Sequence, residues 1–293
     1  MSSSRFSTLL LREWLQHKRG WLLTLVLPPV IFLVLLTFGE AHGLPDMPLA
    51  AGLLPVLMTM LVVLGIAAAS IGFQLPGLAR RDVQDRSIEF WLSLPASHSE
   101  SLAATLLAHV LLVPLAAVAL GFGAGFVIAA AFAVKMGGFA GLAAVPWGQV
   151  AALALPGALR VAAGVVLALV WAAPLILLTM AASAWFKRWS VAVIVGTLVL
   201  TCTILPKIYD FVLVRDWLRA QTKGAWNALL ANPQQLADSP EQIAGIGSAS
   251  AWQWAIADFV GELHNLASLQ MLSGLTLAAL GFYLLVLRRQ RAG

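Results

Sequence analysis

Charged residues are scarce in this chain. They make up 11% of its 293 residues, whereas 60% are hydrophobic, and a soluble domain carries roughly 25% charged residues. A soluble core could not hide so much apolar surface, and the apolar runs recur from one end of the chain to the other. The composition therefore predicts a single membrane domain over residues 1–293, with no independent soluble domain.

Cysteine and metal-binding motifs are almost absent as well. Cys202 is the only cysteine, which excludes an intrachain disulfide and a thiolate metal cluster. The five histidines show neither H-E-x-x-H nor paired ligand spacing. No pair of acid, base or nucleophile stands at membrane depth, so we expect no catalytic, cofactor-binding or metal-binding residue.

The sequence also lacks a phosphate-binding loop of the G-x-x-x-x-G-K-[ST] type. The longest expected cytoplasmic loop is residues 74–100. A nucleotide-binding domain needs on the order of 200 residues, so this loop is far too short to form one. We therefore expect the chain not to be an enzyme, and any ATP hydrolysis to take place on a partner chain. The expected spans hold no confident carboxylate, which argues against a proton- or sodium-driven carrier.

What the sequence does contain is a series of apolar windows of the length that a membrane span needs, about 20 residues. The expected spans are residues 20–39, 49–73, 101–134, 161–185, 189–206 and 266–287. The third window is longer than a span requires, so part of it must project, tilt or bend. Whether residues 136–160 are re-entrant, interfacial or part of a span stays open, with 149–159 favoured as interfacial or re-entrant.

Basic residues predict the orientation of these spans, because basic loops resist translocation. With the N-terminus inside, 12 of the 18 lysines and arginines lie in the cytoplasm. The net charge of +5 is explained by this asymmetry, so nucleic acid is not an expected partner. The first apolar window also exceeds the ~7–15 residues of a signal-peptide core, so we expect a retained span and two cytoplasmic termini.

Residues 1–19 are predicted to form an interfacial helix. Phe6, Leu10 and Trp14 repeat at helical spacing, which is typical of a helix that lies flat on a membrane surface. The opposite face is polar and holds Arg5, Thr8, Arg12, Gln16 and Arg19. The alternative is an ordinary basic flank of the first span.

The cytoplasmic loop 74–100 contains a second short helix, over residues 85–94. Ile88, Trp91 and Leu92 share one of its faces. The run from Ser97 to Glu100 then fits the S-x-x-E capping box, which predicts the start of a new helix at this point.

The external segment 207–265 is too long to be a simple connection. Helical stripes and a possible helix start at Ser239 predict surface helices that lie outside or cover the bundle. The stripes are Ile208, Phe211 and Val212; Trp226, Leu229 and Leu230; and Trp252, Ile256, Phe259 and Val260.

Two ionisable groups need separate interpretation. His109 falls inside the third span, where such a group is by default a functional site such as a proton relay. The alternative is a hydrogen bond to a neighbouring helix, which we favour. Arg160 stands near a span end, where its side chain is expected to extend toward the interface.

Small residues and prolines complete the pattern. Gly121 and Gly125 are four residues apart, as are Gly137 and Gly141, and this spacing predicts close helix packing. Prolines inside the spans would bend helices around a conduit; these are Pro28, Pro29, Pro55, Pro114 and Pro174.

Together these features resemble an ABC-2 type transporter permease. The most specific part is residues 85–95, which read DRSIEFWLSLP, in a loop after the second span. The resemblance implies an all-α polytopic protein with six transmembrane helices, an N-terminal interfacial helix, a short cytoplasmic coupling helix and an external helical segment before the last span. It also implies a type V-like exporter in the bacterial inner membrane.

The resemblance further implies partners. Two ATPase subunits would hold ATP and Mg, and a second permease subunit, identical or related, would complete the path. Ile88, Glu89, Trp91 and Leu92 would couple to the ATPase, with Arg80, Arg81 and Asp82 nearby. The N-terminal helix, through Phe6, Leu10, Arg12 and Trp14, would touch the ATPase or anchor the first span.

The expected function is therefore a permease subunit that exports an amphipathic or lipid-like substrate, such as a drug, peptide or lipid-linked molecule, through a membrane whose lipids contact it. The alternatives are a membrane-embedded enzyme and a non-transporting membrane anchor for an ATPase. A haem- or assembly-related permease is a third alternative within the same broad class. The sequence does not identify the cargo.

Overall fold

The fold is entirely helical over the residues described. A computed structural model describes residues 2–39, 47–79, 97–229 and 247–291, and it contains no strand within them. Five helical stretches are long and apolar enough to cross a membrane, which fits a membrane protein. They are Arg5–Phe38, Pro48–Leu78, His98–Ala144, Trp147–Tyr209 and Leu269–Gln290.

The expected count of six spans depends on the fourth of these stretches, Trp147–Tyr209. Its α-helix α7 (Trp147–Phe186) stops at Lys187, whose φ of 50° lies outside the helical region. After a 3-10 turn (Lys187–Trp189), α8 (Ser190–Val199) lines one cavity together with the last turns of α7. The chain therefore folds back at Lys187, and a separate fifth span over residues 189–206 stays a prediction.

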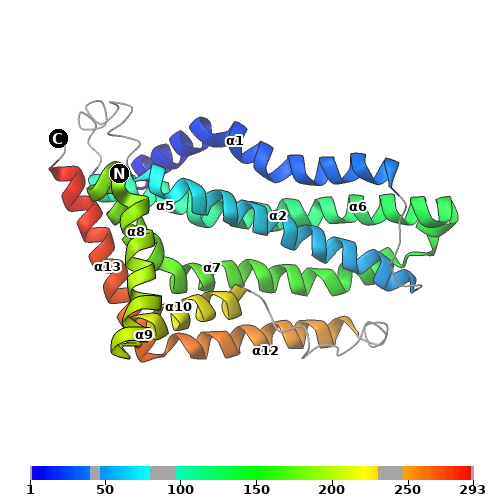
Figure 1. Ribbon diagram of the computed structural model, residues 1–293. Coiled ribbons are helices and arrows are strands. Elements are labelled where there is room, and N and C mark those ends of the chain that lie inside the picture. The colour runs from blue at the N-terminus through cyan, green and yellow to red at the C-terminus, as the bar shows by residue number, and fades with distance from the viewer. Residues whose placement is uncertain (1, 40–46, 80–96, 230–246, 292–293) are drawn as a thin grey trace.

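Helix α1 (Ser2–Phe38) joins the expected interfacial helix and the first span into one element. Figure 1 shows it bending before it runs along α2 (Pro48–Leu78) and α6 (Val113–Ala144). The first turns of α1 and the last turns of α13 (Leu269–Gln290) lie at the same end of the bundle (Figure 1). This arrangement suits two termini on one side of a membrane.

Helices α2 and α6 pack closely at the first predicted glycine pair. A Cβ added at Gly121 would lie 2.8 Å from the Cα of Met60, and one at Gly125 would lie 2.7 Å from the Cα and O of Val56. Only glycine admits a neighbouring backbone at this distance. The prediction of close packing at Gly121 and Gly125 is confirmed.

The second glycine pair has a different role. Gly138 has φ of 60° and breaks α6, and a Cβ at Gly141 would lie 2.5 Å from the O of Ala133 in the same element. Gly137 has no atom within 4 Å of such a Cβ. The chain turns back at Gly138, beyond the third window, and Gly141 packs closely against the preceding segment. The prediction of close packing at this pair therefore holds at Gly141 and fails at Gly137.

Helix α7 also corrects a boundary. It has 40 residues, or about 60 Å at 1.5 Å per residue, and it runs unbroken through residues 149–159 and Arg160. The sequence suggested a break there because Arg160 is charged. Arg160 is instead 2% exposed, so its charge is balanced by partners inside the protein. The helix continues through this residue.

Helices occupy most of the described part of residues 207–265. Helices α9 (Leu205–Tyr209), α10 (Leu213–Leu229) and α12 (Ser248–Leu266) follow α8, and both α10 and α12 pack against α7. Ser268 then caps α13 by accepting a hydrogen bond from the N–H of Met271. The predicted helix start at Ser239 lies outside the described residues.

Candidate functional site

The N-terminal half of α1 buries one stripe of side chains against the bundle. Leu9, Glu13 and Trp21 are 5%, 0% and 9% exposed, and His17 stands between the last two at the same four-residue interval. Since residues four apart share one helix face, this stripe places a carboxylate in the core and an imidazole at its edge. Trp14, whose ring centroid lies 5.9 Å from that of Trp21, is 46% exposed.

Glu13 is the centre of a polar cluster, defined here as the Glu13 cluster: Arg12, Glu13, His17, Thr105 and His109. The Thr105 hydroxyl of α5 (His98–Leu106) donates to Glu13 Oε1 at 3.1 Å, and Arg12 also contacts Oε1. Glu13 Oε2 lies 3.4 Å from His109 Nε2 and 3.7 Å from His17 Nδ1. A buried carboxylate requires such partners, because burial without them costs several kcal/mol.

His109 approaches Glu13 from a widened turn. It lies in a π-helical segment, η1 (Leu107–Leu112), which directly precedes Pro114. Proline has no N–H and its ring clashes with the carbonyl four residues earlier, so the preceding turn cannot close as a regular α-helix. Single π-helical turns of this kind are frequent at functional sites.

The imidazole of His109 is fully buried and packed between aromatic rings. Its ring centroid lies 4.6 Å from that of His17 and 5.0 Å from that of Trp21, both in edge-on geometry. Neither ring nitrogen makes a hydrogen bond. The favoured interpretation, a hydrogen bond to a neighbouring helix, was therefore wrong, because His109 instead faces an acid.

The structure places the other predicted anchor residues on different sides of α1. Phe6 and Leu10 are half-buried, and Leu10 packs against the main hydrophobic core. Arg12 is half-buried beside Glu13. The predicted stripe therefore does not act as one uniform face.

The predicted ATPase-coupling residues lie outside the described residues; they are Ile88, Glu89, Trp91 and Leu92, with Arg80, Arg81 and Asp82. The capping box that follows them is confirmed. Ser97 Oγ accepts from the N–H of Glu100 at 3.2 Å, and the Glu100 carboxylate accepts from the N–H of Ser97 at 2.9 Å.

Sequence reasoning missed Glu13, His17 and Thr105. The available signal was the four-residue spacing of Leu9, Glu13, His17 and Trp21, which marks a face that overlaps the Phe6, Leu10 and Trp14 stripe. Glu13 precedes the first expected span, so the prediction that the spans hold no carboxylate did not reveal this buried acid. Glu13 belongs to the segment 1–19, which the sequence pattern predicted to lie on the membrane surface.

A second buried ion pair joins α7 to the external segment. Arg160 Nε donates to Asp258 Oδ2 of α12 at 2.6 Å, and its NH1 donates to the carbonyl of Ala228 in α10 at 3.0 Å. The prediction that the Arg160 side chain extends toward the membrane interface was therefore wrong. Arg160 links α12 and α10 to α7.

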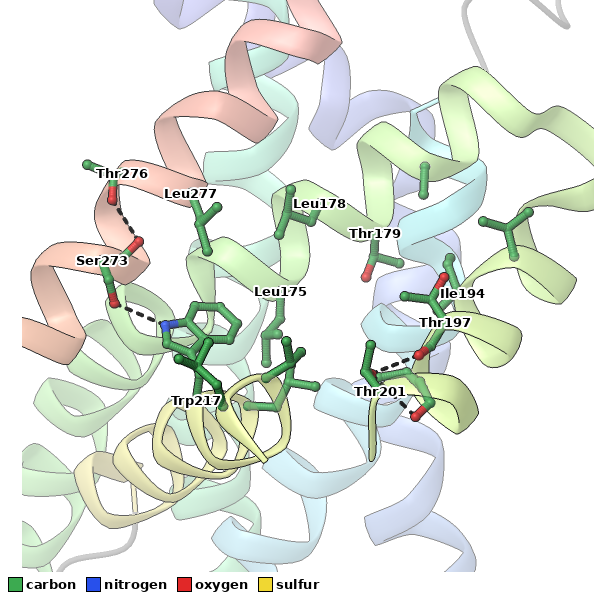
Figure 2. Close-up of a pocket in the computed structure, with 16 residues that line it drawn as sticks. Leu175, Leu178, Thr179, Ile194, Thr197, Thr201, Trp217, Ser273, Thr276 and Leu277 are labelled. Atoms are coloured by element: carbon green, nitrogen blue, oxygen red, sulfur yellow. Dashed lines mark hydrogen bonds between the residues drawn. The ribbon is translucent and has the colours of Figure 1, made fainter. Parts of the chain in front are cut away.

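A third feature is an apolar cavity of about 570 Å³ between α7, α8, α10 and α13. Figure 2 shows Trp217 pointing at Ser273, to which its indole N–H donates at 3.0 Å. Thr201 and Thr276 donate to carbonyls of their own helices. The lining residues carry no charge, so the cavity suits an apolar group.

Comparison of the chain with protein-family models, with curated proteins and with solved structures found no match.

Proposed function

We propose that this chain is the permease subunit of an ATP-binding cassette exporter of the ABC-2 type. Five long apolar helices and the confirmed capping box after the loop 80–96 support this proposal, together with the resemblance of residues 85–95. ATP and Mg would bind to two separate ATPase subunits. A second permease subunit would complete the path.

The observation that carries the proposal is the connection between α1 and the helix that follows the loop. Helix α5 begins directly after residues 80–96, and through Thr105 and His109 the segment α5–η1 contacts Glu13 of α1. A push on the loop by an ATPase would therefore reach both the N-terminal helix and the third span. A buried charge favours such transmission, because its partners must move with it.

The proposed cargo is amphipathic or lipid-like. The apolar cavity between α7, α8, α10 and α13 supports a cargo with an apolar portion. The proposed location is the bacterial inner membrane, with both termini in the cytoplasm. The first and last turns of the described bundle lie at one end (Figure 1), which agrees with this topology.

The test is co-purification with an ATPase subunit encoded beside this chain, followed by measurement of ATP hydrolysis in lipid. Trp91→Ala and Glu89→Ala should reduce ATPase association and transport-linked hydrolysis at least tenfold. Trp189→Ala is the matched control, because Trp189 is an exposed tryptophan in a different predicted cytoplasmic turn.

Association that survives both loop variants would show that the coupling assignment is wrong. Transport by the chain without any ATPase would overturn the family assignment. An ATPase that binds but never responds to added amphipathic cargo would instead indicate a membrane anchor.

A further inference from the structure

We propose that Glu13, His17 and His109 form a binding site for one divalent transition-metal ion, of the class to which zinc belongs. The proposal does not depend on an ATPase partner. It rests on the donor set, on the spacing of the donor atoms and on the state of His109.

The donor set is two imidazoles and one carboxylate. Each of the three side chains offers one ligand atom, and these atoms all lie within 4.8 Å of one another. Two histidines and one acid with a remaining open position form a recurrent zinc site in proteins. Glu13 and His17 are four residues apart on α1, so one helix face presents both.

The spacing agrees with tetrahedral coordination. Metal–ligand bonds of about 2.0–2.1 Å place tetrahedral ligand atoms about 3.4 Å apart. Glu13 Oε2 lies 3.4 Å from His109 Nε2 and 3.7 Å from His17 Nδ1. The ligand atoms of His17 and His109 lie within 4.8 Å of each other, so these two imidazoles would approach each other by up to about 1.4 Å when an ion binds. His17 Nδ1 also lies 3.0 Å from the carbonyl O of Glu13, so binding through Nδ1 would replace that contact.

The state of His109 supplies the independent observation. Its side chain is 1% exposed, and both ring nitrogens lack a hydrogen bond. Leaving a buried polar atom unpaired costs about 1–3 kcal/mol. A metal ion on Nε2 would satisfy one of these atoms and would explain why the π-helical turn directs the ring at Glu13.

Arg12 and Thr105 also bind the Glu13 carboxylate and would lie next to a bound metal ion. Both bind Glu13 Oε1, whereas the two imidazoles face Oε2. Supporting bonds to the second oxygen of a ligating carboxylate orient it toward the metal. The positive charge of Arg12 weakens cation binding, so we expect an affinity below that of closed structural zinc sites.

The test uses the full chain, purified with a tag that contains no histidine and reconstituted in lipid nanodiscs. Zn²⁺ and Co²⁺ are the probes. We expect one ion bound per chain and visible Co²⁺ absorption bands typical of four-coordinate nitrogen and oxygen ligands. His17→Ala should lower the affinity for Zn²⁺ about tenfold or more.

His264→Ala is the matched control, because His264 Nδ1 also lies beside the carbonyl of the residue four positions earlier, at 2.8 Å, but on exposed α12. It should leave both the affinity and the Co²⁺ spectrum unchanged. His17 is partly exposed at the edge of the cluster, so its replacement tests the site even if His109→Ala fails to fold.

Two results would overturn the proposal. One is a wild-type chain that binds no stoichiometric Zn²⁺ or Co²⁺. The other is binding that persists unchanged in His17→Ala and in Glu13→Gln. A rise in the thermal unfolding midpoint with Zn²⁺ in the wild type, and its loss in His17→Ala, would support the site further.

Discussion

Replacing Asp258 by leucine should destabilise the protein more than the loss of any exposed charge. Asp258 accepts from Arg160 Nε at 2.6 Å, and the two side chains are 9% and 0% exposed. Leucine leaves a buried guanidinium without its counter-ion. Breaking a buried pair in this way costs about 3–5 kcal/mol, so the free energy of unfolding should fall by about that amount.

A double-mutant cycle separates the ion pair from general packing. Arg160→Met should also destabilise, because it leaves the Asp258 carboxylate in the core and removes the hydrogen bond to the carbonyl of Ala228. The double variant Arg160→Met/Asp258→Leu removes both charges, and such replacements are often neutral. We expect a favourable coupling energy of about 2 kcal/mol or more between the two sites.

The assay is denaturant titration in mixed micelles, with the fluorescence of the 11 tryptophans as the signal. Asp216→Leu is the control, because Asp216 accepts from Arg215 at 3.1 Å with both side chains substantially exposed. Exposed pairs contribute about 0.2–1 kcal/mol. If Asp258→Leu cost no more than this control, or if the single effects simply added, the reasoning would be refuted.

Three further predictions concern packing and caps. Gly125→Leu should destabilise the protein by about 2 kcal/mol or more, because the new side chain meets the backbone of α2. Gly123→Leu is the control and should change stability by less than about 1 kcal/mol, because the space around its Cβ is open. Equal effects of the two variants in the same titration would contradict the close contact. Ser97→Ala should cost about 1 kcal/mol, and Glu100→Gln much less, since glutamine also serves at this position of a capping box; hydrogen exchange at the start of α5 measures both, and unchanged exchange in Ser97→Ala would refute the cap. Trp217→Phe should cost about 1 kcal/mol through its lost hydrogen bond to a serine of α13, and an unchanged unfolding curve would show that this bond contributes nothing.

Local signals in the sequence predicted local features well. The capping box at Ser97 and Glu100 depends on residues three apart, and the close contact at Gly121 and Gly125 needs only small side chains on one helix face. Both features depend on residues that are close together in the sequence, so they can be predicted without knowing which distant segments pack against them. The helical character of the external segment follows from periodicity in the same way.

The misjudged residues are those whose partners are distant in sequence. Arg160 resembles a span boundary until Asp258, 98 positions later, is placed beside it. Glu13 resembles a surface charge until Thr105, 92 positions later, donates to it. The sequence shows a charge but not its burial, because burial depends on which helices pack together.

Composition and periodicity by themselves determined that this is a helical protein with membrane-length apolar segments, since a scarcity of charge leaves no soluble alternative. They also determined where the helix capped by Ser97 starts. Only the tertiary structure decided that α1 directs Glu13 and His17 into the bundle, that His109 faces them from a π-helical turn, and that Arg160 holds α12 to α7. The physical reason is that a buried charge is tolerated only beside its partner, and packing alone brings the partners together.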